Sequence, residues 1–296
     1  MKNKLITVIG TTACGKSDLA IKLARHFDGE IISADSRQIY RGLDLGTGKV
    51  TAEEQAMAKH HLIDILDPNT PYSAAEFQQD AYNAIDSVIA AGKLPILCGG
   101  TGLYSRAVVE GYDFSDAPPS QELRDELSVK TREELLAILA SHGVVDIDAQ
   151  KSSRHLIRMI EKIVDGGTHE PCNKPKYDVL QLAMTFDRPI LLERIKTRLE
   201  ARIKAGMIEE VKNLLNGGAT PEFLEGLGLE YRYTYRYIAG MYESYDAYFE
   251  QLNTEINKFS KRQMTWFRKE KNVIWLDMNT DFEAQAIQYI EDFLKN

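Results

Sequence analysis

The segment from Gly10 to Ser17 constrains the fold of this chain more than any other. It reads G-x-x-x-x-G-K-S, follows the apolar run 5–9 and precedes a helical stripe of apolar residues. In such a loop the backbone curls around an anion, the following helix adds its positive N-terminal end, and the lysine adds a mobile cation. Strand, loop and helix in this order predict a phosphate site rather than an incidental glycine-rich turn. The residues predicted to hold the phosphate, together called the P-loop, are Gly10, Thr11, Thr12, Ala13, Cys14, Gly15, Lys16 and Ser17. The Ser17 hydroxyl is the predicted ligand of a phosphate-bound Mg²⁺.

Charge and composition exclude several classes of protein. A net charge of -8 and an isoelectric point near 5.4 argue against a protein that coats nucleic acid without selectivity. There is no apolar run of membrane-spanning length and no basic-then-apolar leader, so we expect a cytoplasmic protein that does not bind membranes. The cysteines, Cys14, Cys98 and Cys172, have neither the pattern of a disulfide framework nor the spacing of zinc ligands. We also expect a monomer.

The order of the predicted elements indicates an α/β fold with a parallel sheet flanked by helices. The predicted strands cover 5–9, 30–33, 94–98, 177–184 and 273–277. Pro118-Pro119 then leads into charged, helix-forming sequence, which predicts a mostly helical insertion. A long amphipathic helix is predicted from Ile190 to Leu215, closed by Gly217-Gly218, and the Tyr-rich segment 220–271 is helical in pattern. The predicted domains are a P-loop core (1–114), a helical insertion (115–176) and a continuation of the core with C-terminal helices (177–296).

Asp35 lies where a predicted strand ends, at the edge of the sheet where α/β proteins bind ligands. Its carboxylate could ligate Mg²⁺ through water or act as a general base; alternatively, it caps the next turn. The basic and aromatic segment 258–271 leaves two interpretations open as well, an RNA-binding surface or a solvated helix face anchored by core aromatics. A regulatory GTPase is unsupported, since the guanine-recognition signatures are missing.

Further motifs carry a specific resemblance to a known family. They are S-A-D-S-R-Q-I-Y-R-G (33–42) with Gly46-Thr47, H-H-L-I-D (60–64), Y-S-A-A-E-F (72–77), G-G-T-G-L-Y (99–104), Asp187-Arg188 with Arg194 and Arg198, and K-R-Q-M-T-W-F-R (261–268). In this order they resemble the tRNA dimethylallyltransferase (isopentenyltransferase) family, whose members are similar to P-loop NTPases in fold. The resemblance implies transfer of a dimethylallyl group from dimethylallyl diphosphate to N6 of the adenosine at position 37, next to the anticodon of tRNA.

The same resemblance implies roles for individual residues. The P-loop would hold the donor diphosphate with Mg²⁺ as cofactor, and the implied catalytic residues are Lys16, Asp35 as general base, Thr101 and Arg188. Residues implied to contact the tRNA anticodon loop are Asp35, Ser36, Arg37, Gln38, Thr101, Arg154, His155 and Arg158. The chain departs from the usual family pattern at Thr11, Cys14, His155 and Ile256-Asn257.

Three other functions remain as alternatives. A free-adenylate isopentenyltransferase would use the same donor, but a mononucleotide acceptor needs neither the insertion nor the basic C-terminal segment. A small-molecule P-loop kinase would use the insertion as an arginine-bearing lid. A non-catalytic nucleotide-binding module is disfavoured, because Asp35 and Thr101 are expected to converge on the loop.

Overall fold

The computed structural model describes residues 2–114, 120–149, 151–166 and 173–295 of the chain. Contacts between residues divide it into two compact units. The core unit comprises Met1–Val109 and Lys176–Asn296, and the insertion unit comprises Glu110–Pro175.

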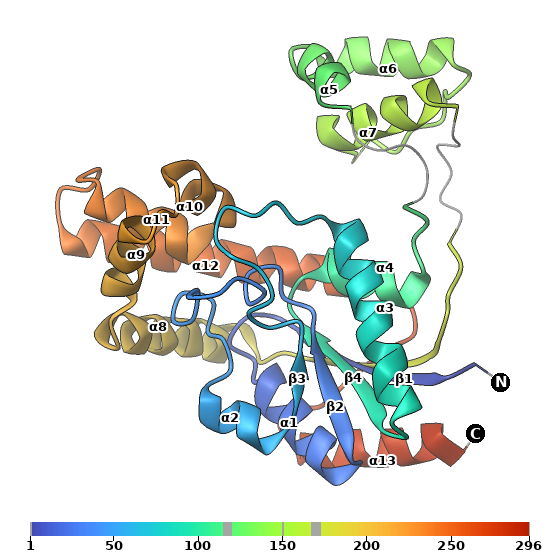
Figure 1. Cartoon of the computed structure of the whole chain (residues 1–296), viewed down its shortest axis with the longest axis vertical. Coiled ribbons are helices and arrows are strands. Elements are labelled where there is room, and N and C mark those ends of the chain that lie inside the picture. The colour runs from blue at the N-terminus through green and yellow to red at the C-terminus, as the bar shows by residue number, and fades with distance from the viewer. Residues whose placement is uncertain (1, 115–119, 150, 167–172, 296) are drawn as a thin grey trace. The chain divides into compact units, whose positions relative to one another are not determined.

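The elements of the core unit alternate between strands and helices in its first half and are mainly helical in its second half (Figure 1). The strands are β1 (Lys4–Gly10), β2 (Gly29–Ser33), β3 (His60–His61), β4 (Leu94–Gly99), β5 (Asp178–Met184) and β6 (Val273–Trp275). The helices are α1 (Lys16–His26), α2 (Ala52–Met57), α3 (Ala74–Ala90), α4 (Gly102–Glu110), α8 (Arg188–Lys204), α9 (Met207–Asn216), α10 (Pro221–Leu227), α11 (Leu229–Ile238), α12 (Tyr245–Phe267) and α13 (Phe282–Lys295).

The strands form one parallel sheet in the order β3-β2-β4-β1-β5-β6. β1 lies in the interior, with Ile6 opposite Ile96 of β4 and Leu180 of β5. This confirms the predicted α/β fold with a parallel sheet flanked by helices. Strand β3 was not predicted, because two residues are too short to show a periodic pattern. In a parallel sheet all carboxyl ends meet at one edge, so the loops after β1, β2 and β4 gather there.

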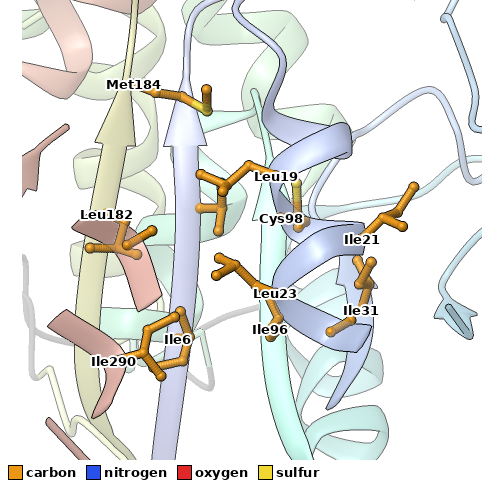
Figure 2. Close-up of a cluster of buried hydrophobic side chains, with 14 of the residues drawn as sticks. Ile6, Leu19, Ile21, Leu23, Ile31, Ile96, Cys98, Leu182, Met184 and Ile290 are labelled. Carbon is orange, nitrogen blue, oxygen red and sulfur yellow. The ribbon is translucent and has the colours of Figure 1, made fainter. Parts of the chain in front are cut away.

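Helices cover both faces of this sheet because successive strand residues point to opposite sides. Ile6 and Val8 of β1 pack with Leu19 of α1 and Ile290 of α13 on one face, and Figure 2 shows the cluster around Ile6. Leu5 points to the other face, which α3 and α4 cover. The apolar stripe predicted for the first helix is thus the surface that fixes the P-loop helix against the sheet.

The prediction of one helix from Ile190 to Leu215 is wrong. The chain forms two helices, because Gly206 adopts a φ of 108° between Lys204 at the end of α8 and Met207 at the start of α9. That left-handed conformation interrupts the helical hydrogen bonds and suits glycine. The predicted helix end is confirmed, since Gly217 caps α9.

The Tyr-rich C-terminal segment is helical, as predicted. Buried residues of α8, α9, α11 and α12 form a shared core that includes Tyr248, whose hydroxyl hydrogen-bonds to Thr234 Oγ1 at 2.8 Å. Tyr231 of α11 lies in a neighbouring buried cluster with residues of the Ile39–Leu43 segment. This helical layer therefore connects the second half of the chain to loops at the carboxyl edge of the sheet.

The insertion unit is also helical. Its elements are α5 (Gln121–Ser128), α6 (Arg132–Ser141) and α7 (Ser153–Val164), packed around their own buried core of Leu127, Leu135, Leu139, Leu156 and Ile160. The Pro118-Pro119 pair, which predicted the start of the insertion, and Cys172 lie outside the described residues. Within the described ranges, no helix combines the length and apolar character needed to cross a bilayer.

Glu30, near the amino end of β2, is a buried carboxylate that is 5% exposed. His61 Nε2, Lys59 Nζ and Lys93 Nζ lie 2.7, 3.0 and 3.0 Å from its oxygens. Burial raises the pKa of Glu30, but the hydrogen bonds from His61, Lys59 and Lys93 outweigh burial and lower that pKa to about 2. The folded state therefore favours the ionised carboxylate.

We expect Glu30→Gln to lower the free energy of unfolding by about 1–3 kcal/mol near neutral pH. The pKa lies below its ordinary value of 4.5, so the stabilisation is present above pH 4.5 and is lost as the pH falls toward 2. Urea unfolding at several pH values should show that the difference in free energy of unfolding between wild type and variant shrinks as the pH falls from 4.5 toward 2. The control Asp67→Asn removes an ion pair in which the Asp67 side chain is 77% exposed, and should have little effect at any pH. If the difference in free energy of unfolding between wild type and Glu30→Gln did not change with pH, the lowered pKa of Glu30 would be contradicted.

Candidate active site

Separate segments of the core unit line one cavity of about 310 Å³ at the carboxyl edge of the sheet. The P-loop and the start of α1 supply Thr12, Lys16 and Ser17. The segment 35–38 follows β2, and Thr101 follows β4. The structure thus brings eight of the predicted site residues to one cavity, namely Thr12, Lys16, Ser17, Asp35, Ser36, Arg37, Gln38 and Thr101.

The P-loop is built to face an anion. Helix α1 begins at Lys16 after the N-cap Gly15, and no side chain caps its first turn. Its first N–H groups therefore remain available at the positive end of the helix. Lys16 Nζ donates to the Thr11 carbonyl at 2.7 Å, which holds the ammonium at the loop.

Asp35 and Thr101 are linked through the backbone between β2 and the following turn. Asp35 Oδ1 accepts the Arg37 N–H at 3.0 Å, and Thr101 Oγ1 accepts the Ser36 N–H at 3.2 Å. The Thr101 N–H in turn donates to the Ala34 carbonyl at 3.3 Å. Asp35 therefore caps its turn and also lines the cavity, so the two interpretations of this residue are compatible.

A row of arginines on α8 reaches the P-loop, and no role was predicted for these residues from the motifs. Arg194 Nε donates to the Ala13 carbonyl at 2.8 Å, and Arg198 Nη2 donates to Thr12 Oγ1 at 2.6 Å. Arg202 continues the row. Spacings of four residues put all three side chains on one face of the helix, which is the signal that could have identified them.

Arg198 and Arg202 place two interacting cations on this face of α8. Burial and the neighbouring charge of Arg202 lower the pKa of Arg198 to about 10, while the Glu230 carboxylate opposes that shift. Arg198 remains a cation at neutral pH. An anionic ligand near Lys16 and Arg198 would offset the repulsion between Arg198 and Arg202, because its negative charge attracts both cations.

Helix α12 closes the cavity, and its Gln263 was also missed. Gln263 Oε1 accepts the Thr12 N–H at 2.8 Å, and its Nε2 donates to the Gly100 carbonyl at 2.9 Å. One side chain therefore bridges the P-loop and the loop after β4. Trp266, one turn further along α12, also lines the cavity, and the Arg106 guanidinium lies 4.6 Å from its ring centre.

The exposed side of α12 carries a basic groove that shares Arg262 and Trp266 with the cavity. We call it the α12 groove; it is lined by Lys258, Lys261, Arg262, Thr265, Trp266 and Lys269. Phe267, in contrast, is 1% exposed and packs against the sheet. The C-terminal segment thus combines an aromatic core anchor with a basic surface that begins at the mouth of the cavity.

A second cavity of about 580 Å³ is also lined by P-loop residues, among them Ala13 and Gly15. It shares Lys16, Ser17, Gly48 and Arg198 with the first cavity, so the two cavities adjoin at the P-loop.

The two described cysteines, Cys14 and Cys98, are buried free thiols. Burial raises the pKa of Cys98 to about 12, so this thiol is protonated at neutral pH and is a poor nucleophile.

Comparisons with known proteins identify the family. A family model described as IPP transferase matches residues 38–270. The tRNA dimethylallyltransferase 2 of Shewanella sediminis (strain HAW-EB3) is 43% identical over 306 residues, which cover 99% of each chain. The protein of the same name from Porphyromonas gingivalis (strain W83) is 42% identical over 296 residues, or 96% of this chain and 97% of that protein. The chain belongs to the IPP transferase family. This confirms the resemblance inferred from the motifs.

Solved structures agree with this membership of the IPP transferase family. A full-length tRNA isopentenylpyrophosphate transferase from Bacillus halodurans matches with a TM-score of 0.76 and 34% identity, over 99% of this chain and 96% of that one. A eukaryotic dimethylallyltransferase acting on tRNA matches with a TM-score of 0.85 over 99% of this chain and 80% of that one. At 24% identity the second match is a likeness of fold. These matches confirm the P-loop NTPase-like fold class.

Some residues singled out by the IPP transferase motifs lie away from the cavity. Arg188 is exposed at the start of α8, where it donates to Ser260 Oγ at 2.8 Å and to the Asn257 carbonyl at 3.2 Å. It is not among the described residues that line the cavity.

Three others lie on α7 of the insertion unit. Arg154 is exposed, His155 Nδ1 hydrogen-bonds to Ser152 Oγ at 2.8 Å, and Arg158 pairs with the buried Glu161 at 3.1 Å. Their proposed contacts with tRNA stay predictions.

Proposed function

We propose that this chain transfers the dimethylallyl group of dimethylallyl diphosphate to N6 of the adenosine next to the anticodon in tRNA, and releases diphosphate. The observation that carries the proposal is the meeting of three features in one cavity: the cationic P-loop, the Asp35 carboxylate and the basic groove at the mouth. The P-loop would bind the leaving diphosphate, Asp35 would accept the proton of the amine, and the basic groove would bind the RNA. Membership of the IPP transferase family supports the same reaction.

The P-loop would bind the diphosphate end of the donor. Its backbone N–H groups and the start of α1 supply fixed partial charges, and Lys16 adds a full positive charge. Arg198 suits the additional cation better than Arg188, because Arg198 lines the cavity and bonds to Thr12. These groups stabilise the negative charge that grows on the diphosphate as the allylic carbon–oxygen bond breaks.

Asp35 would accept the proton. The exocyclic N6 donates its lone pair into the purine and is a weak nucleophile, so the forming carbon–nitrogen bond must be matched by loss of an N6 proton. Asp35 lines the cavity beside the P-loop and is held by the Arg37 N–H. Thr101, which shares this turn through Ser36, would orient the amine with its hydroxyl.

Ser17 suits a Mg²⁺ ion bound to the diphosphate. It lines both cavities at the first turn of α1, and a hydroxyl oxygen is a hard ligand of the kind that Mg²⁺ accepts. The ion would neutralise part of the charge of the departing diphosphate.

The target adenine has to leave the stack of the anticodon loop to reach the cavity, as bases do in enzymes that modify them. Arg262 and Trp266 lie at the junction of the cavity and the α12 groove, where a cation can meet RNA phosphate and an aromatic ring can stack on a base. Ser36, Arg37 and Gln38 also line the cavity and stay predicted contacts of the base or its neighbours. We propose the cytoplasm, where tRNA is found, as the site of action, and a monomer as the active form.

A free-adenylate isopentenyltransferase is the second candidate, because it would use the same cavity. The α12 groove favours tRNA, since a mononucleotide that fits the cavity has no need of a basic surface outside it.

The test incubates the purified protein with dimethylallyl diphosphate and Mg²⁺, and with either unmodified tRNA or AMP. We expect mass spectrometry of the nucleosides to show a five-carbon addition to tRNA adenosine and none to AMP. Modification of AMP alone would establish the second candidate, and phosphate transfer from labelled ATP without prenylation would indicate a kinase.

A further inference from the structure

The short loop from Asp44 to Gly48 forms one wall of the cavity. Gly46, Thr47 and Gly48 line it, and Gly48 also lines the second cavity. The conformation of this loop therefore shapes the space in which a ligand of the P-loop is held.

Glu210 of α9 holds the loop through its backbone. Its Oε2 accepts the N–H groups of Asp44 at 3.1 Å and Leu45 at 2.7 Å, and its Oε1 accepts the Gly46 N–H at 3.1 Å. The Tyr231 hydroxyl of α11 donates to the same Oε1 at 2.7 Å. Four donors thus converge on one carboxylate, which has about four acceptor sites. Burial, and next the charge of Glu210, raise the pKa of Tyr231, so the phenol keeps the proton that it donates.

The loop fits closely against the side chains that surround Glu210. A Cβ at Gly46 would lie 2.6 Å from Tyr231 Cζ, so only glycine fits this position without a shift of the ring. The Gly46 carbonyl accepts from Arg202 Nη1 at 3.3 Å, and Arg202 lies one helical turn from Arg198 on α8. The loop is consequently connected to the arginine row at the P-loop.

We propose that Glu210 is a positioning residue for the donor: it fixes the Asp44–Gly46 backbone so that the wall from Gly46 to Gly48 and the arginine row keep the shape that binds a diphosphate. The reading of the ligand as the prenyl donor rests on the proposed function. Glu210 does not line the cavity among the described residues and acts through the loop. In Glu210→Gln an amide N–H₂ group replaces one carboxylate oxygen. Two of the four donors would then face a donor instead of an acceptor.

The test compares Glu210→Gln with Glu209→Gln, a matched control at the adjacent residue. The Glu209 side chain is 66% exposed and pairs with Lys212 on the surface. Glu210→Gln should raise the KM for dimethylallyl diphosphate roughly 10-fold while kcat changes less than about threefold, as loss of ground-state positioning predicts. Glu209→Gln should leave both constants unchanged. A fall in kcat at constant KM would overturn the positioning role.

Two readouts separate this inference from the proposed function. Amide hydrogen exchange of the peptide spanning 43–49 should accelerate in Glu210→Gln and not in Glu209→Gln, and calorimetric binding of inorganic diphosphate should weaken in parallel. Both can be measured even if the wild type transfers no prenyl group, an outcome that would refute the proposed function alone. Unchanged exchange or unchanged diphosphate affinity in Glu210→Gln would overturn the inference.

Tyr231→Phe provides a second variant in case Glu210→Gln fails to fold. It removes one of the four donors and keeps the ring that packs against Gly46. We expect amide hydrogen exchange of the peptide 43–49 to accelerate in Tyr231→Phe as well, but less than in Glu210→Gln. If a folded Tyr231→Phe exchanged at the wild-type rate, this would count against the role of the Glu210 hydrogen bonds.

Discussion

Asp35→Ala is expected to lower the turnover number roughly 100-fold or more and to leave tRNA affinity largely intact. The carboxylate is the proposed acceptor of the N6 proton, and it lies in the cavity beside the P-loop. Its removal slows bond formation without touching the α12 groove. Single-turnover rates with saturating tRNA and donor measure this step directly.

Asp35→Asn separates catalysis from structure. The amide oxygen can still accept the Arg37 N–H, so the turn that Asp35 caps is retained while the base is lost. A catalytic role predicts a similar loss of rate for alanine and asparagine, whereas a capping role predicts near-normal rates for asparagine. Asp67→Asn, at an exposed ion pair, is the control for a change of charge alone. Near-normal single-turnover rates in Asp35→Ala would remove the residue from the mechanism.

Lys16→Ala should lower kcat/KM for the donor by roughly 100- to 1000-fold, with contributions from both KM and kcat. The ammonium lies at the P-loop, bound to the Thr11 carbonyl, and its charge acts on the bound diphosphate and more strongly on the departing one. Steady-state kinetics with varied dimethylallyl diphosphate would give both constants.

Lys22→Ala is the matched control, because Lys22 lies on the same helix but pairs with Glu283 on the surface. It should leave the kinetics unchanged. If Lys16→Ala kept both the rate and the donor affinity of the wild type, the P-loop would not be the donor site.

Local features of this chain could be predicted because their signals lie within a few residues. The residues from Gly10 to Ser17 are enough to predict the conformation of the loop that they form. A continuous apolar run marks the buried strand 94–98. The polar ends of the strands could be placed together, since parallel strands end at one edge of the sheet. The break at Gly206 was missed, because the apolar stripe continues across it and a glycine alone does not decide whether a helix ends.

Contacts between distant segments could not be predicted in the same way. Arg188 and Arg198 both lie on α8, and only tertiary packing decides which helix face meets the P-loop. Gln263 reaches the Thr12 N–H across more than two hundred residues of sequence. Glu210 binds backbone N–H groups, which have no sequence pattern of their own, so no motif could indicate its partners.

The interior place of β1 has a consequence for synthesis on the ribosome. One neighbour, β4, ends at Gly99, but the other, β5, begins only at Asp178, after the insertion unit has been made. A nascent chain halted before Asp178 would therefore expose one unpaired edge of its phosphate-binding strand, and such an edge invites association with other chains. Stalled or truncated forms of this protein should depend on chaperones until β5 has emerged and closed the sheet.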